Sequence, residues 1–357
     1  KLLDAFAAQY PDVKVNSVVY ATGDVYQKLQ VALSAGTGAP DVVLLEDSHI
    51  GQFVDLGGLT DITDLVKPYT DKIVPYKFEQ VTKDNKVYGM PWDVGPVVTY
   101  YRTDVFQKAG LSTKPDDVSK MVDTWDDYLQ TCQTILAKTQ LKCMPLSKAN
   151  NDARVYEMML WQQGLGYTDS KGNVSVDSPD NIATLQELGK FWAAGVTSDE
   201  QPWTDAWYAD FSSTDKPVAS LVEAAWMGGN YKGWIAPKTG GDWGVALMPA
   251  MKAGQARSAN DGGSTFAIPV QTQNKDAAWA FIQFLVGNAA NNNALYKSSN
   301  IFPGLIDAYT NNDLYNQPDS FFNGQVVGKI YVDVAKQIPA ATIYGTHYQE
   351  ISGFVAT

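Results

Sequence analysis

Residues 86–106, which read KVYGMPWDVGPVVTYYRTDVF, decide the fold. They begin as a short strand that ends at Pro91, and Trp92 and Asp93 follow it. A second apolar strand over residues 97–101 then leads into a helix start. This order is typical of a chain that crosses between two lobes beside a cleft. An aromatic face next to a carboxylate also suits a sugar, because the ring covers C–H groups while the carboxylate accepts hydrogen bonds from hydroxyls.

The composition favours two lobes and excludes several partners. A chain of 357 residues with 45% hydrophobic and 18% charged residues is well packed and longer than one ordinary core requires. The net charge of -12 argues against nucleic acid and anionic membranes, because both need clustered Lys and Arg. No stretch reaches the roughly 18 apolar residues of a membrane helix. We expect a neutral ligand and a monomer.

The two cysteines, Cys132 and Cys143, admit two interpretations. A disulfide between them would close a short loop, stabilise the fold by roughly 3 kcal/mol and indicate an oxidising compartment outside the cytoplasm. Alternatively, both are buried free thiols. A metal site is disfavoured, because two cysteines at this spacing lack a neighbouring histidine.

The N-terminal part alternates strands and helices. Residues 12–20 (DVKVNSVVY) have strand composition, a helix follows over residues 24–35, and residues 41–45 (DVVLL) predict a buried parallel strand. Glu46 and Asp47 come next, and ligands of open α/β sheets bind outside the carboxyl ends of the strands. The pair therefore marks a binding site, or Asp47 merely caps the next helix; the two interpretations are compatible.

Beyond residue 106 the pattern is mostly helical. Thr124 and Asp127 predict a capping box, and Ser178 with Pro179 predicts another helix start. A glycine-led strand over residues 262–269 (GGSTFAIP) returns the chain toward its first part. We therefore expect interleaved lobes. The expected division is residues 1–101 and 264–304 for the N-terminal lobe, and residues 102–263 and 305–357 for the C-terminal lobe.

Ten Trp and 19 Tyr make the chain rich in rings that could bind a ligand. We expect Trp125, Trp192 and Trp279 in the core, because they lie on apolar helical faces. Others lie near Gly, Pro or Asp, where a tryptophan outside a periodic face tends to bind a partner. These are Trp92, Trp203, Trp207, Trp226, Trp234 and Trp243, of which we expect two or three to face a ligand, Trp92 and Trp226 first.

Catalysis has little support in the sequence, and we expect a protein that is not an enzyme. The only histidines are His49 and His347, and no G-x-S-x-G, H-E-x-x-H, P-loop or G-x-G-x-x-G motif is present. Glycosidases need two carboxyls about 5 to 10 Å apart across a sugar, and adjacent acids such as Glu46 and Asp47 point differently. A glycoside-active enzyme is the less favoured alternative, and it predicts loss of cleavage in Asp93→Asn. We expect no cofactor and no metal ion.

Six segments in a fixed order carry a resemblance that spans nearly the whole chain. They are residues 20–33 (with GDVYQKLQ), 39–45 (APDVVLL), 58–65 (GLTDITDL), 86–106, 218–226 (VASLVEAAW), and 262–269 followed by 275–285 (KDAAWAFIQFL). The chain thereby resembles the extracytoplasmic solute-binding proteins of bacterial ABC importers, in particular the carbohydrate-binding family that includes maltose-binding protein. That family begins with a strand before the helix at residues 2–10 and ends with a long helix after Pro339. This chain shows neither in full, which we interpret as missing terminal pieces.

The resemblance implies a two-lobed periplasmic-binding-protein fold of type II. Each α/β lobe is then a mostly parallel sheet flanked by helices, and the lobes are hinged around a central cleft. Hinge crossings are implied at residues 101–102, 262–265 and 302–305. The expected ligand-binding residues are Glu46, Asp47, Trp92, Asp93, Tyr167, Trp203, Trp207, Trp226, Gly262, Gly263 and Tyr344.

The resemblance also implies a function. An oligosaccharide, glucose-containing on family analogy, would enter the cleft and shift the population toward a closed state that the membrane subunits of an ABC importer recognise. The protein would lie outside the cytoplasm, in the periplasm or lipid-anchored at the outer face of the cell membrane. The alternative is the same fold with another solute, such as a polyamine, a peptide or glycerol phosphate. A phosphate is disfavoured, because Arg102, Arg154 and Arg257 are scattered.

Overall fold

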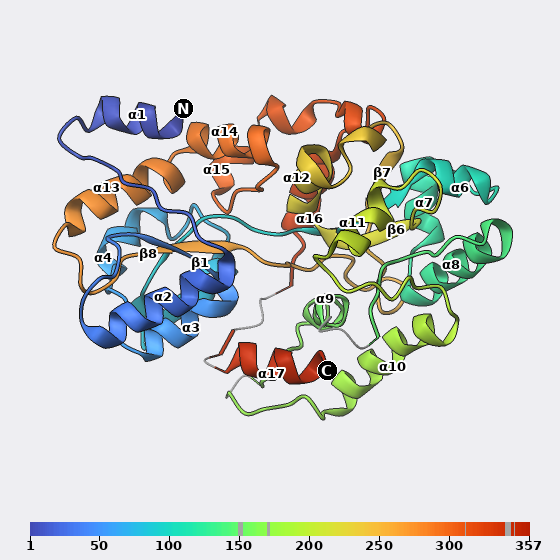
Figure 1. The fold of residues 1–357 in the computed structure, drawn as a ribbon, viewed down its shortest axis with the longest axis horizontal. Helices are drawn as coiled ribbons and strands as arrows, with labels where there is room; N and C mark the ends of the chain where they lie inside the picture. The colour runs from blue at the N-terminus through green and yellow to red at the C-terminus, as the bar shows by residue number, and fades with distance from the viewer. Residues whose placement is uncertain (149–152, 170–171, 311, 340–343, 346) are drawn as a thin grey trace.

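The computed structural model describes residues 1–148, 153–169, 172–310, 312–339, 344–345 and 347–357. Two three-stranded sheets, each with its own helices, lie side by side along the longest axis (Figure 1). No helix in these ranges is long and apolar enough to cross a membrane.

The first sheet contains β1 (Val43–Glu46), β8 (Ser264–Ala267) and β4 (Met90–Pro91), with β8 in the centre. A two-stranded hairpin of β2 (Thr82–Lys83) and β3 (Lys86–Val87) lies nearby in the sequence. The helices of the first part of the chain are α1 (Leu2–Gln9), α2 (Thr22–Ala35), α3 (Asp47–Asp55), α4 (Thr63–Val66), the 3₁₀ helix η1 (Lys67–Tyr69) and α5 (Pro75–Gln80). Beyond β8 follow α13 (Lys275–Val286), α14 (Ala289–Ser299) and α15 (Ile306–Tyr309).

The second sheet contains β5 (Val97–Arg102) between β6 (Ser220–Ala224) and β7 (Trp243–Leu247). Its segment of the chain holds α6 (Thr103–Lys108), α7 (Pro115–Met121), α8 (Trp125–Thr139), α9 (Arg154–Trp161), α10 (Pro179–Ala193), α11 (Asp205–Ser212), α12 (Trp226–Asn230), the π-helix η2 (Tyr231–Ile235) and the 3₁₀ helix η3 (Pro237–Thr239). The C-terminal part adds η4 (Asp313–Asn316), η5 (Ser320–Phe322), α16 (Val327–Ala335) and α17 (Tyr348–Val355). The predicted capping box of Thr124 and Asp127 and the Ser178 cap are both confirmed.

The expectation of mostly parallel sheets is wrong, because every strand pair in these two sheets is antiparallel. The reason is the interleaving of the chain. β1 and β6 run toward one region between the sheets and end there, at Glu46 and Ala224. β8 and β5 begin in that same region, immediately after the chain crosses between the sheets, and run away from it. A strand that begins directly after a crossing therefore runs antiparallel to its neighbours.

β5 also bears on the expected lobe division. Its residues pair with β6 and β7, so residues 101–102 lie inside the second sheet rather than between the sheets. This pairing favours a first boundary before Val97. The remaining boundaries stay predictions.

Residues 12–20 form no strand, contrary to expectation. Strand composition is not sufficient, because a strand also needs a hydrogen-bonded neighbour, and none of the described strands or bridges pairs with this segment. Val18, Val19 and Tyr20 accordingly remain exposed.

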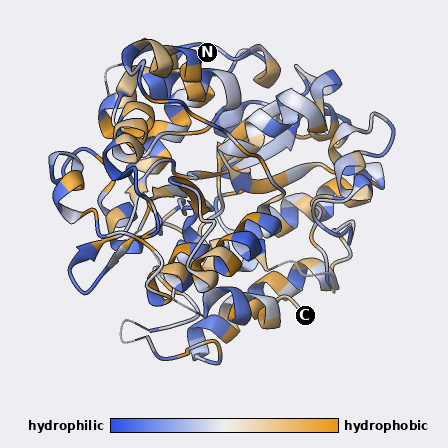
Figure 2. Ribbon diagram, turned by 60° about the vertical axis from the view of Figure 1, so that its left-hand side comes forward, coloured by the Kyte–Doolittle hydropathy of each residue, from blue (hydrophilic) through white to orange (hydrophobic). Residues whose placement is uncertain are grey.

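The apolar side chains form separate cores around the two sheets and a third core beneath α12, α14 and α16. Trp125 lies fully buried in the core of the second sheet, and Trp279 packs against that of the first. Orange hydrophobic and blue hydrophilic residues alternate along the helices, as expected for helices with one buried face (Figure 2).

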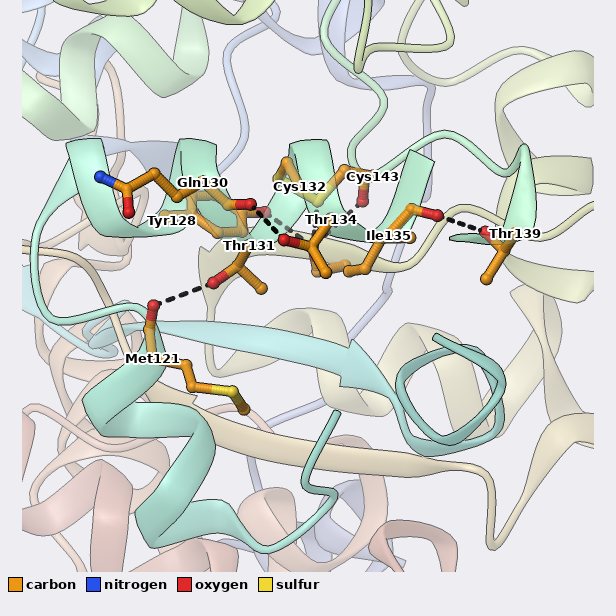
Figure 3. Close-up of a disulfide and its surroundings, with 10 residues drawn as sticks. Met121, Tyr128, Gln130, Thr131, Cys132, Thr134, Ile135, Thr139 and Cys143 are labelled. Carbon is orange, nitrogen blue, oxygen red and sulfur yellow. Dashed lines mark hydrogen bonds between the residues drawn. A yellow bond between two sulfur atoms is a disulfide. The ribbon is translucent and has the colours of Figure 1, made fainter. Parts of the chain in front are cut away.

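Cys132 and Cys143 form a disulfide, which selects between the two interpretations of the sequence. Figure 3 shows the bridge joining α8 to the chain that follows it. Both residues are fully buried in the core of the second sheet. The bridge is consistent with a protein that folds in an oxidising compartment.

Candidate functional site

A cavity of about 650 Å³ lies between the two sheets, where β1 ends and β8 begins. Of the expected ligand-binding residues, the cavity is lined by Glu46, Asp93, Trp203, Trp226, Gly262, Gly263 and Tyr344. It is not lined by Asp47, Trp92, Tyr167 or Trp207. A larger hollow of about 800 Å³ lies between residues 12–18, α2 and β1, and it contains none of the expected residues.

The acidic pair after β1 divides between two environments. Glu46 ends the strand with its side chain toward the cavity, and the protein around it raises the pKa of its carboxyl by desolvation, which the attraction of Arg154 opposes. Asp47 is 1% exposed and forms an ion pair with fully buried Lys77. Its other oxygen accepts a hydrogen bond from the Thr265 hydroxyl at 2.8 Å. Asp47 also makes no side-chain cap on α3, so it is a buried structural group.

The glycine pair passes directly over this ion pair. Gly263 has a φ of 108°, a conformation that side chains rarely adopt. A Cβ there would lie 2.6 Å from the Lys77 ammonium and 2.8 Å from an Asp47 oxygen. Glycine at this position therefore lets the backbone line the cavity and cover the buried charges.

Asp93 is buried at the edge of the cavity and accepts a hydrogen bond from the Ser264 backbone N–H at 2.7 Å. Burial raises the pKa of its carboxyl to about 6, against the lowering attraction of Lys77. The preceding Trp92 turns away and packs on Phe266, with ring centroids 5.4 Å apart. Successive residues of an extended chain point to opposite sides, which explains why only one of the two reaches the cavity.

Two tryptophans form the opposite wall. Trp226 begins α12 directly after β6, and its ring stacks on that of Trp203 with centroids 6.0 Å apart and planes inclined by 27°. The Trp226 indole N–H donates to the Asp261 carbonyl at 3.1 Å, which fixes the ring. Trp207 is 3% exposed and lies beneath Trp203, 5.1 Å between centroids. It supports the wall from the core.

Arg154 lies between this wall and a group of acids. Its guanidinium is 5.1 Å from the Trp226 ring and 5.6 Å from the Trp203 ring, within cation–π range. It also pairs with Glu223 and Asp261, each at 3.4 Å. Burial raises the pKa of Glu223 well above its ordinary value, although Arg154 acts to lower it. The arginine thus pairs with two carboxylates, of which Asp261 lines the cavity.

Glu157 is a further acid that lines the cavity. It accepts hydrogen bonds from the Tyr167 hydroxyl at 2.8 Å and the Ser352 hydroxyl at 2.7 Å. Burial raises the pKa of its carboxyl. Tyr167 therefore does not line the cavity, and it contacts the lining residue Glu157 through this hydrogen bond. Nearby, the Gln349 amide of α17 donates to the Ser48 carbonyl of α3 at 3.4 Å, linking elements on two sides of the cavity.

Sequence reasoning missed ten lining residues: Ser48, His49, Arg154, Glu157, Trp161, Asp261, Ser264, Tyr348, Gln349 and Ser352. One signal was available. Arg154 and Glu157 stand three residues apart on an otherwise apolar helix, so they share one face of it. Among the described residues, no group of three or more His, Cys, Asp or Glu side chains could hold a metal ion.

Comparisons with known proteins find relatives that are named as sugar-binding proteins. The arabinooligosaccharide-binding protein of Bacillus subtilis (strain 168) is 29% identical over 92% of this chain and 76% of its own length. The lactose-binding protein of Rhizobium radiobacter is 28% identical over 98% of this chain and 81% of its own. A solved ABC-transporter-associated binding protein from B. animalis subsp. lactis Bl-04, in complex with beta-1,6-galactobiose, has a TM-score of 0.80 and 27% identity, covering 99% of this chain and 87% of its own.

A solved extracellular solute-binding protein of family 1 has a TM-score of 0.83 at 23% identity over 99% of this chain and 88% of its own, which shows a shared fold. Maltose-bound T. maritima MalE3 shares this fold too, with a TM-score of 0.79 at 20% identity over 99% of this chain and 88% of its own. The family described as bacterial extracellular solute-binding proteins matches residues 1–292. The match covers most of the chain, and we conclude that this protein belongs to that family of bacterial extracellular solute-binding proteins.

Proposed function

We propose that this protein captures an oligosaccharide in the cavity between its two sheets. The observation that carries the proposal is the pairing of a tryptophan wall, Trp203 and Trp226, with carboxylates on the facing surfaces. A pyranose or furanose ring offers an apolar C–H face to the indoles and hydroxyl donors to the acids. The names of several relatives, which bind arabino-oligosaccharides, lactose or galactobiose, support the same class of ligand.

The charge of the cavity selects against anions. Among the lining residues that the structure describes, the acids Glu46, Asp93, Glu157 and Asp261 face one Lys or Arg side chain, that of Arg154. A phosphate or carboxylate would meet repulsion from the acids, whereas neutral hydroxyls can donate to them. A glucose-containing sugar stays a prediction, as does the use of the same fold for a non-sugar solute.

Closure around the ligand is the proposed mechanism. Glu46 ends β1 of the first sheet, and Trp226 begins α12, which follows β6 of the second sheet. A sugar that contacts both residues therefore binds best when the two sides approach. Such a ligand shifts the population toward the closed state. The membrane subunits of an ABC importer would recognise that state outside the cytoplasm, where the protein is free in the periplasm or lipid-anchored. No chemical step is needed.

Isothermal titration against a sugar panel tests the proposal. The panel contains arabino-oligosaccharides, lactose, beta-1,6-galactobiose and maltose, with glycerol phosphate and a polyamine as non-sugar probes. We expect saturable binding of at least one oligosaccharide, weakened about tenfold in Trp226→Ala, since about 1.4 kcal/mol of ring contact is lost. Trp279→Ala is the matched control, because Trp279 packs in the first core away from the cavity.

The outcomes separate three functions. Binding of a non-sugar probe alone would replace the sugar with another solute. Disappearance of the bound sugar with time, followed by chromatography, would indicate a glycoside-active enzyme, and Asp93→Asn would then abolish the cleavage. Recovery of intact sugar supports a binding protein.

A further inference from the structure

The aromatic wall continues out of the cavity. Trp203 lines the cavity, and the Tyr208 hydroxyl donates to the Trp203 carbonyl at 3.1 Å. The Tyr208 ring meets the Trp234 ring edge to face, with centroids 4.9 Å apart. Buried Trp207 lies beneath, 5.1 Å from the Trp203 ring and 5.7 Å from the Tyr208 ring. We call Trp203, Tyr208 and Trp234 the aromatic strip.

The strip is solvent-accessible along its length. Trp203 is 42% exposed and Trp234 is 52% exposed, and Tyr208 between them is half-buried. Apolar side chains scattered singly over a surface need no explanation, but adjoining large rings do. These rings also begin at the cavity, so the strip is continuous with the proposed binding site.

Uncommon backbone holds both ends of the strip in place. Trp203 has a φ of 65°, in the left-handed region that a bulky residue rarely adopts. Trp234 is presented by the π-helix Tyr231–Ile235, a form that is frequent at functional sites. Local strain of this kind is more common where function requires a particular side-chain position.

The strip carries little charge of its own. Lys232, beside Trp234, forms an ion pair with Asp319. The Trp234 indole N–H donates to the Asn230 side-chain oxygen at 3.4 Å, and the Tyr208 hydroxyl donates to the Trp203 carbonyl. The surface therefore offers ring faces and edges with a few neutral polar groups, which suits an uncharged sugar unit.

We propose that the aromatic strip is an outer subsite, which stacks against the units of a longer neutral oligosaccharide that protrude from the cavity. This inference rests on the proposed function. It further specifies the ligand: chains longer than a disaccharide bind more tightly than the disaccharide of the same series. Trp226 and the acids then hold the inner units, and Tyr208 and Trp234 hold the outer ones.

The experiment compares chain lengths in the intact protein. Dissociation constants are measured by isothermal titration for the disaccharide and the longer homologues of the arabinose and galactose series. In Trp234→Ala we expect the longest homologue that binds to lose about threefold to tenfold in affinity, the loss of one ring contact. The disaccharide should bind as it does to the wild type.

Controls make each outcome decisive. Tyr20→Ala removes a comparably exposed ring beside the distant hollow and should change neither constant. An equal loss for short and long chains in Trp234→Ala, or no loss for either, would overturn the subsite while leaving the proposed function intact. Absence of binding to every sugar by the wild type would overturn the proposed function and the subsite together.

Discussion

The two sides of the cavity differ in whether their side chains find their partners within the protein or remain available to a ligand. On the first-sheet side, Asp47, Lys77 and Thr265 form a buried junction in which each charged or polar group has a partner. On the second-sheet side, the aromatic wall of Trp203 and Trp226 lines the cavity with its indole rings. Interactions completed within the protein stabilise the fold, whereas open faces are available to a ligand. Changes in the junction should therefore lower stability, and changes in the wall should lower affinity.

The largest expected effect is the loss of the junction's acid. Asp47→Ala leaves the Lys77 ammonium buried without its carboxylate, which should lower the free energy of unfolding by about 4 kcal/mol. Chemical denaturation followed by circular dichroism measures this. Glu46→Gln is the matched control, because the neighbouring acid faces the cavity and its loss should weaken sugar binding with little change in stability. Equal stability losses in the two variants would erase the distinction between the two sides.

Neighbouring tryptophans provide the next test. Trp207→Ala removes a buried ring beneath the wall and should lower the free energy of unfolding by about 3 kcal/mol, through lost transfer energy and a new cavity. Trp203→Ala removes an exposed ring that lines the cavity, so thermal denaturation should change little while sugar affinity falls about tenfold. Unchanged stability in Trp207→Ala would show that this ring is not a support.

The contrast between Asp47 and Trp92 on one hand and Glu46 and Asp93 on the other marks what the sequence can predict. Its local patterns place Gly262, Gly263 and Trp226 at the cavity, because these depend on element order and turn chemistry, but they place the first crossing too late, at residues 101–102 inside β5. They do not decide which of two adjacent residues faces the cavity. That choice follows from where each strand ends and how the chain turns, which is a property of the assembled sheets.

Arg154 and Glu157 illustrate a second limit. They are two polar residues in an otherwise apolar helix, and their roles depend on Glu223, Asp261 and Ser352, which lie far away in the sequence. Sheet direction was mispredicted for a related reason. A short apolar run predicts a buried strand but carries no information on the direction of its neighbours, which the crossings of the chain determine.

A methyl group over the junction should have a smaller effect than loss of its charge. Gly263→Ala combines a left-handed backbone with a Cβ 2.6 Å from the Lys77 ammonium, and we expect about 2 kcal/mol of destabilisation by denaturant titration. Gly254→Ala is matched in conformation, with a φ of 80°, but its Cβ would meet nothing within 4 Å. It should therefore lose only the conformational part, about 1 kcal/mol. If both variants lose the same amount, close approach to the ion pair is not what requires glycine at residue 263.

The smallest effect, taken per pH unit, concerns Asp93, which lines the cavity and whose carboxylate is attracted by Lys77 of the junction. Burial raises the pKa of its carboxyl from 3.8 to about 6. The folded protein therefore keeps a proton that the unfolded chain releases, and this stability is present below pH 3.8 and is lost as pH rises through about 6. The contribution to the slope is at most about 1 kcal/mol per pH unit. Asp93→Asn should flatten the profile of unfolding free energy against pH, because the amide does not titrate. The amide oxygen can still accept the hydrogen bond from the Ser264 backbone N–H.

Asp210 on α11 provides a control for Asp93, because it tests the effect of a buried, titrating carboxyl that does not contact the ligand. Burial also raises the pKa of its carboxyl to about 6, but Asp210 does not line the cavity. Asp210→Asn should remove a similar share of the slope without changing sugar affinity, whereas Asp93→Asn should change both. Calorimetric titration at one pH, together with denaturation at several, distinguishes the two. A pH profile that neither substitution flattens would mean that both carboxyls ionise in the folded protein as they do in the unfolded chain, and the cavity acid would then be no different from a solvent-exposed one.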